Sequence, residues 1–189
     1  MKTLRNVVAS NIKDIITEKL VLNKSTSKEN EYKYHPKDWD ELRGLLKKLL
    51  DERGEDADLN DIDVSNVNTF RQLFIGLAPH NIDLSEWDTS NVTNMNGMFE
   101  DCTNFKSANI ANWDTSKVED MRWVFTGSKF NEEIAGWDVS NVENMRSMFY
   151  GCKKFNSDLS QWNVRKVKNM YGMFDGCESL KKKPSWYVQ

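Results

Sequence analysis

The chain repeats one motif five times, and this periodicity constrains its fold more than any other feature. The motif reads NVTNMNGMFEDC at 91–102, KVEDMRWVFTGS at 117–128, NVENMRSMFYGC at 141–152 and KVKNMYGMFDGC at 166–177, with a divergent copy, NVNTFRQLFIGL, at 66–77. Periods of 20–29 residues are typical of proteins built from stacked coils, because a single coil cannot bury its apolar face alone.

Aromatic residues keep the same register as the motif. Four tryptophans follow one another at intervals of 26, 24 and 25 residues: Trp87, Trp113, Trp137 and Trp162, with Ile62 in the same position of the first copy. One phenylalanine per copy keeps step with them: Phe74, Phe99, Phe125, Phe149 and Phe174. Aromatic side chains bury roughly 150–250 Å² each. We therefore expect these columns to form a continuous core.

Within each copy, the spacing of apolar residues predicts a short helix. Val92, Met95 and Phe99 recur at helical intervals in their copy. Two of the copies also contain a Ser followed three residues later by a Glu, the pattern of a capping box: Ser116 with Glu119, and Ser140 with Glu143. The segment after each helix, such as Phe105 to Trp113, predicts a short strand.

The predicted fold class is an α/β repeat, a leucine-rich-repeat-like right-handed solenoid of five coils of about 25 residues at 58–178. Each coil contributes a short parallel strand and a short helix. Residues 1–57 are predicted to form an N-terminal cap with helices at about 11–20 and 38–53, and residues 179–189 a C-terminal cap. Asp38 and Gly54 have the residue types of a helix start and a helix stop.

The units WDTSNVTNMNGMFEDC, WDVSNVENMRSMFYGC and WNVRKVKNMYGMFDGC resemble the BspA-type leucine-rich repeat of bacterial surface proteins, over roughly residues 31–187. The resemblance implies a solenoid used for recognition, often for adhesion or for binding host or partner proteins. It implies no catalytic residue. The chain departs from that family because it shows no secretory signal peptide or lipobox.

Motifs for catalysis, metal binding or cofactor binding are not found. The two histidines, His35 and His80, are far apart, and no HExxH or nucleophile elbow is present. Cys102, Cys152 and Cys177 share a position that Leu or Ser takes in the other copies, which favours packing over a catalytic thiol. We expect a non-enzymatic protein without cofactor or metal.

The N-terminal segment lacks a continuous apolar stretch, and no run of 18 apolar residues occurs. These features predict a protein that is not inserted in a membrane and is cytoplasmic, whereas the family resemblance also allows the cell surface.

The best candidate for a partner-binding surface is a column on the predicted helices. Trp123 stands where other copies have small or polar residues, and Trp flanked by Arg is typical of interface hot spots; an equally good alternative is that Trp123 fills a gap between coils. The proposed residues are Arg122, Trp123, Arg146, Tyr150 and Tyr171. The favoured function is recognition of another protein, and a surface adhesin is the alternative.

Charge is distributed unevenly along the chain. Residues 55–143 hold five basic and seventeen acidic side chains, a net charge of −12, whereas residues 153–183 hold eight and three, a net charge of +5. Chance variation of charge on solvated faces is the slightly favoured explanation. The functional alternative is an end that attracts an acidic partner, or end-to-end association of copies through opposite charges. Nucleic-acid binding would use the basic end, although the acidic bulk argues against it. The residues of this end are Arg165, Lys166, Lys168, Lys181, Lys182 and Lys183.

Overall fold

The computed structural model describes residues 32–188. The chain divides into two units at Tyr34, and the description below concerns the second unit, Tyr34–Gln189, alone. The helix predicted at about 11–20 lies outside the described residues.

The second unit opens with helix α2, Trp39–Arg53, in the place where the sequence predicts a helix over 38–53. The Asp38 side chain accepts a hydrogen bond from the Glu41 N–H at 3.0 Å, so an otherwise unpaired donor of the first turn is satisfied. Gly54 follows the last turn with φ of 87°, and its N–H donates to the Leu50 carbonyl at 2.9 Å. Four leucines form the buried face: Leu42, Leu46, Leu49 and Leu50.

The predicted α/β leucine-rich-repeat solenoid is wrong. In residues 32–188, α2 is the one helix, and strand pairing is limited to isolated parallel bridges rather than a sheet. Most of these bridges fall within the segments predicted to be helical. The bridges within these segments form one column of consecutive pairs: Thr69 with Asn94, Asn94 with Asp120, Asp120 with Asn144, and Asn144 with Asn169.

Left-handed backbone positions explain why no helix forms in the motif. Each copy has two residues with positive φ, four positions apart, and a right-handed helix cannot continue through them. The first of the two is Gln72, Gly97, Trp123, Ser147 or Gly172, and the second is Gly76, Asp101, Gly127, Gly151 or Gly176. The apolar spacing therefore arises from consecutive tight turns, such as the one closed by the Met98 N–H on the Met95 carbonyl at 3.1 Å.

The predicted capping boxes are also wrong. The backbone N–H of Ser116 donates to the Asp114 side chain at 3.0 Å, and Ser140 donates in the same way to Asp138 at 2.9 Å. A side chain that accepts from the N–H two residues later forms an Asx turn, which competes with helix formation. Asp114 with Ser116, and Asp138 with Ser140, therefore form turns at the corners of their coils.

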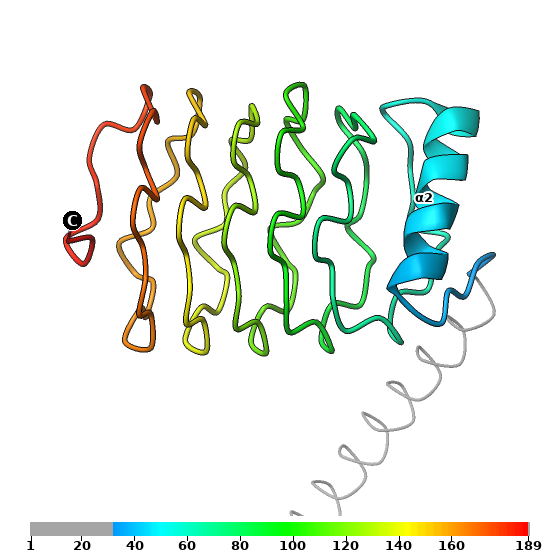
Figure 1. Ribbon diagram of the computed structural model, residues 1–189, viewed down its shortest axis with the longest axis horizontal. Coiled ribbons are helices and arrows are strands. Elements are labelled where there is room, and N and C mark those ends of the chain that lie inside the picture. Colours follow the sequence, from blue (N-terminus) through cyan, green and yellow to red (C-terminus); the bar gives the residue numbers. More distant parts are fainter. Residues whose placement is uncertain (1–31, 189) are drawn as a thin grey trace, which may run out of the picture. The chain divides into compact units, whose positions relative to one another are not determined.

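Successive coils lie side by side, with α2 at one end of the unit and the C-terminal residues at the other (Figure 1). Alternate N–H groups join each coil to the next: Met95 donates to the Asp120 carbonyl at 2.9 Å, and Phe99 to that of Val124 at 2.8 Å. Because these groups are paired between coils, the backbone is satisfied without regular strands. None of the described helices is long and apolar enough to span a bilayer.

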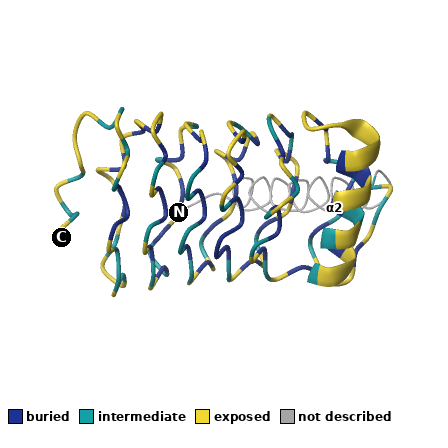
Figure 2. Cartoon of the chain, turned by 45° about the horizontal axis from the view of Figure 1, so that its top comes forward, coloured by how far each residue is buried: buried dark blue, intermediate teal, exposed yellow. Residues whose placement is uncertain are grey.

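The core consists of stacked aromatic columns, and buried positions alternate with exposed ones along the coils (Figure 2). Ring centroids along the phenylalanine column lie 4.9 Å apart for Phe74 and Phe99, and 5.8 Å for Phe99 and Phe125. Each indole of the tryptophan column, from Trp87 to Trp186, also donates to a carbonyl of the preceding coil, as Trp113 does to Leu84 at 3.0 Å. These contacts fix the alignment of neighbouring coils.

Candidate functional site

Four of the five predicted partner-binding residues form one continuous series of contacts. The Arg122 guanidinium lies 5.5 Å from the Trp123 ring centroid, and Arg146, one coil later, lies 5.9 Å from the same ring. Arg146 also lies 6.0 Å from the Tyr171 ring of the following coil. We call Arg122, Trp123, Arg146 and Tyr171 the cation–aromatic row. Such contacts stabilise by about 0.5–1 kcal/mol each at exposed sites.

Tyr150, the fifth predicted residue, is 52% exposed. Within the described residues it makes no ring or cation contact with the row. The structure therefore brings four of the five residues together and leaves Tyr150 apart.

Trp123 occupies a backbone position that disfavours it. Its φ is 57°, and Gly97 and Gly172 hold the equivalent left-handed position in two other coils. A left-handed conformation costs a non-glycine residue about 1–2 kcal/mol. The Trp123 N–H donates to the Arg146 carbonyl at 3.0 Å, so inter-coil pairing holds the residue there. The half-buried indole lies between two guanidinium groups rather than in the core.

The two arginines of the row have different partners. Arg122 forms an ion pair with Asp120 at 2.7 Å, and this hydrogen bond raises the pKa of the Arg122 guanidinium. Arg146 has no carboxylate within ion-pair distance among residues 32–188, and its guanidinium contacts the two rings instead. Arg146 is therefore an exposed cation whose hydrogen-bond donors remain available to a partner.

The predicted basic end is less uniform than its sequence suggests. Lys168 forms an ion pair with Glu143 at 2.8 Å, and Lys166 donates to the Asn141 side chain at 2.6 Å. The Lys183 ammonium lies 5.1 Å from the Tyr187 ring. The other members, Arg165, Lys181 and Lys182, are exposed. Two of the six cations are thus already engaged by the preceding coil.

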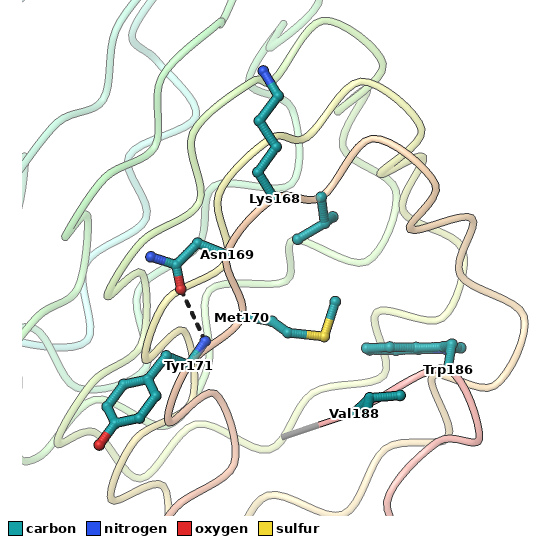
Figure 3. Close-up of a pocket in the computed structure, with 7 residues that line it drawn as sticks. Lys168, Asn169, Met170, Tyr171, Trp186 and Val188 are labelled. Carbon is teal, nitrogen blue, oxygen red and sulfur yellow. Dashed lines mark hydrogen bonds between the residues drawn. The ribbon is translucent and has the colours of Figure 1, made fainter.

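A hollow of about 500 Å³ lies on the last coil, and sequence analysis missed it. Met170, Trp186 and Val188 provide apolar walls, and the Tyr171 N–H donates to the Asn169 side chain at 3.0 Å beside it (Figure 3). A signal for these walls is present in the sequence, because Leu180 and Trp186 repeat the apolar-to-tryptophan pattern of the earlier coils.

Two of the three cysteines lie in the core, and Cys177 packs against it partly buried. Cys102 and Cys152 are buried, and all three cysteines are free. Their thiols donate to carbonyls of the preceding coil, Cys102 to Phe74 at 3.4 Å and Cys152 to Phe125 at 2.9 Å. Burial raises the pKa to about 12 for Cys102 and Cys177 and to about 11 for Cys152. A thiol with so high a pKa is a poor nucleophile at neutral pH.

Residues 32–188 contain no group of three or more His, Cys, Asp or Glu side chains placed to hold a metal ion.

Comparison with known proteins gives one family. A family model described as "Mycoplasma protein of unknown function, DUF285" matches residues 46–129 and 103–189. The match supports a repeat family and does not distinguish the BspA-type leucine-rich repeat. No curated protein and no solved structure is significantly similar to the chain.

Proposed function

We propose that this chain, which belongs to the Mycoplasma family of unknown function DUF285, is a non-enzymatic repeat protein that binds another protein through its cation–aromatic row. The observation that carries the proposal is the strained Trp123, with φ of 57°, placed between Arg122 and Arg146. Strained backbone positions persist where the surrounding structure stabilises them, and they are concentrated at functional sites.

The chemistry of the row suits an interface. Trp, Tyr and Arg are the residues most enriched among interface hot spots. Tyr171 is 75% exposed, so its ring offers apolar area to a partner. Arg146 is held between two rings, which reduces the side-chain entropy lost on binding a partner carboxylate.

The experiment that tests this proposal is affinity capture with the full chain at physiological salt. Wild type is compared with the double variant Trp123→Ala/Arg146→Ala. Arg71→Ala is the matched control, because Arg71 is an exposed arginine at the equivalent position of the first coil. A stoichiometric protein retained by wild type and by Arg71→Ala, but lost with the double variant, would support the proposal.

Equal capture by the double variant would place the binding surface elsewhere. If the wild-type chain captures no protein, the result would contradict an intracellular partner. It would favour an extracellular ligand, as expected for a surface adhesin. Binding of nucleic acid that weakens steeply with salt would instead indicate the basic end.

A further inference from the structure

Two successive coils carry the same arginine beside a different neighbour. Arg122 and Arg146 hold equivalent positions, and the residue two places earlier is Asp120 in one copy of the motif and Asn144 in the next. Both neighbours form the same turn, because their side chains accept from the backbone N–H groups of Arg122 and Arg146 at 3.0 Å. The two coils therefore share this local backbone geometry and differ by one negative charge.

That charge decides which groups each guanidinium can bind. Asp120 engages Arg122 through both carboxylate oxygens, Oδ1 at 3.0 Å from Nε and Oδ2 at 2.7 Å from Nη2. Bidentate pairs of this kind are among the strongest side-chain hydrogen bonds. Asn144 is neutral, and within residues 32–188 no carboxylate lies within ion-pair distance of Arg146. The coil of Arg146 thus lacks the carboxylate that the coil of Arg122 supplies from its own chain.

The Arg146 side chain is exposed but held by its neighbours. Its guanidinium lies 5.9 Å from the Trp123 ring centroid and 6.0 Å from that of Tyr171. Contacts with ring faces orient a guanidinium without using its N–H donors. Arg146 is therefore pre-organised to bind an oxyanion that approaches from solvent.

The surrounding charges favour a carboxylate over a phosphate. Glu119 and Glu143 lie three residues before Arg122 and Arg146, and the Glu143 N–H donates to the Glu119 carbonyl at 2.8 Å. Lys168 pairs with Glu143 at 2.8 Å, whereas Glu119 forms no ion pair within residues 32–188. A phosphate group carries a charge of about −1.5 to −2 at neutral pH. One unpaired guanidinium beside these glutamates balances the single charge of a carboxylate better than the larger charge of a phosphate.

We propose that Arg146 binds one aspartate or glutamate carboxylate of a separate protein, in the position that Asp120 fills in the preceding coil. Trp123 and Tyr171 then contact apolar side chains next to that carboxylate. This inference rests on the proposed function, because it names the chemistry that the cation–aromatic row recognises. A second copy of the chain is a poorer partner, because residues 55–143 have a net charge of −12 and repel their equivalent in another copy.

The test is an NMR titration of the full chain with the peptide acetyl-Phe-Glu-Phe-amide. Its carboxylate is the probe for Arg146, and its two rings are the probes for Trp123 and Tyr171. The signals followed are the Trp123 indole N–H and the Arg146 Nε–H. Two matched peptides carry glutamine or phosphoserine in place of the glutamate. The glutamate peptide should bind at least about tenfold more tightly than the glutamine peptide, and more tightly than the phosphoserine peptide.

One substitution in the chain supplies the missing carboxylate from within. Asn144→Asp keeps a side chain that can form the turn and gives Arg146 the partner that Arg122 has in Asp120. The internal carboxylate should weaken binding of the glutamate peptide at least about tenfold. Asn94→Asp is the matched control, because it adds the same charge to the same column in the copy before Asp120. It should change the affinity by less than about twofold.

The reverse substitution tests the selectivity against phosphate. Asp120→Asn frees the Arg122 guanidinium and removes a negative charge, so the phosphoserine peptide should bind this variant more tightly than wild type. Arg71→Ala should leave all three peptide affinities unchanged, because Arg71 lies two copies of the motif before Trp123 and outside the cation–aromatic row.

Several results would overturn the inference. Equal affinities for the glutamate and glutamine peptides would exclude a bound carboxylate, and tighter binding of the phosphoserine peptide to wild type would make phosphate the ligand. Full affinity of a folded Asn144→Asp variant would show that Arg146 does not bind the carboxylate. Shifts of the same signals with protein concentration alone would identify a second copy as the occupant.

Affinity capture separates this inference from the proposed function. A partner that is lost with Trp123→Ala/Arg146→Ala and also with Asn144→Asp would support both. A partner that is lost with the double variant but retained by Asn144→Asp would leave the proposed function intact and overturn the carboxylate assignment.

Discussion

Trp123 combines a left-handed backbone with the largest side chain in its column, and the other members of that column are Gln72, Gly97, Ser147 and Gly172. A residue that fitted the turn better would be glycine. The indole makes two cation contacts, with Arg122 and Arg146. At the residue scale, the unusual position was visible without coordinates, because a tryptophan stands among small and polar residues, and its role in binding stays a prediction.

We predict that Trp123→Gly is more stable than Trp123→Ala by about 1 kcal/mol. Both variants lose the half-buried indole, but only glycine relieves the left-handed strain. Urea unfolding of the two variants measures the difference. An alanine variant as stable as the glycine variant would show that position 123 is not strained. Both variants should lose partner capture.

The buried thiols make a second prediction at this scale. Burial raises the pKa of Cys102 to about 12, above the value of about 8.5 expected in the unfolded chain. The folded state then holds this proton more tightly, so stability is complete below about pH 8.5 and falls as the pH rises toward 12. Cys102→Ser should flatten this part of the pH dependence, as measured by denaturant unfolding at pH 8 and pH 10.5. Serine already occupies the equivalent position at Ser128. An unchanged slope would contradict burial of the thiol.

At the element scale, α2 and the repeated motif illustrate what apolar spacing can and cannot predict. The helix was predictable, because Asp38, the leucine pattern and Gly54 all indicate the same element. The conformation of the motif could not be predicted in the same way. Consecutive tight turns place apolar residues at the same intervals of three and four residues as a helix does. Gly97 and Gly172 indicate a left-handed position in their copies of the motif. Gln72 and Ser147 adopt the same conformation, although their residue types do not indicate it.

We predict that Arg43→Ala destabilises the chain by about 2–3 kcal/mol, because it removes charge-assisted donors from the carbonyls of Gln72, Leu73 and Ile75. Lys47→Ala, at an exposed position of the same helix, should change stability by less than about 0.5 kcal/mol. Thermal unfolding compares the two variants. Equal stabilities would show that the carbonyls of Gln72, Leu73 and Ile75 do not depend on the Arg43 guanidinium.

At the scale of the whole described unit, Tyr34–Val188, helix α2 lies at one end of the stack and the cation–aromatic row joins three successive coils. The period of the sequence correctly indicated which residues share a column, because the aromatic rings that stack are the ones the period aligns. It could not indicate the hollow beside Met170, Trp186 and Val188. The hollow depends on how these side chains pack in the last coil, which a list of apolar positions does not contain.

The measurement that tests the account most directly is the affinity of a captured partner for wild type and for Trp123→Ala/Arg146→Ala, determined by isothermal titration with Arg71→Ala as control. Two hot-spot residues at one interface predict a loss of about 100-fold, or about 2.7 kcal/mol, with the control unchanged. An affinity of the double variant within about twofold of wild type, with both proteins folded, would contradict binding through the cation–aromatic row.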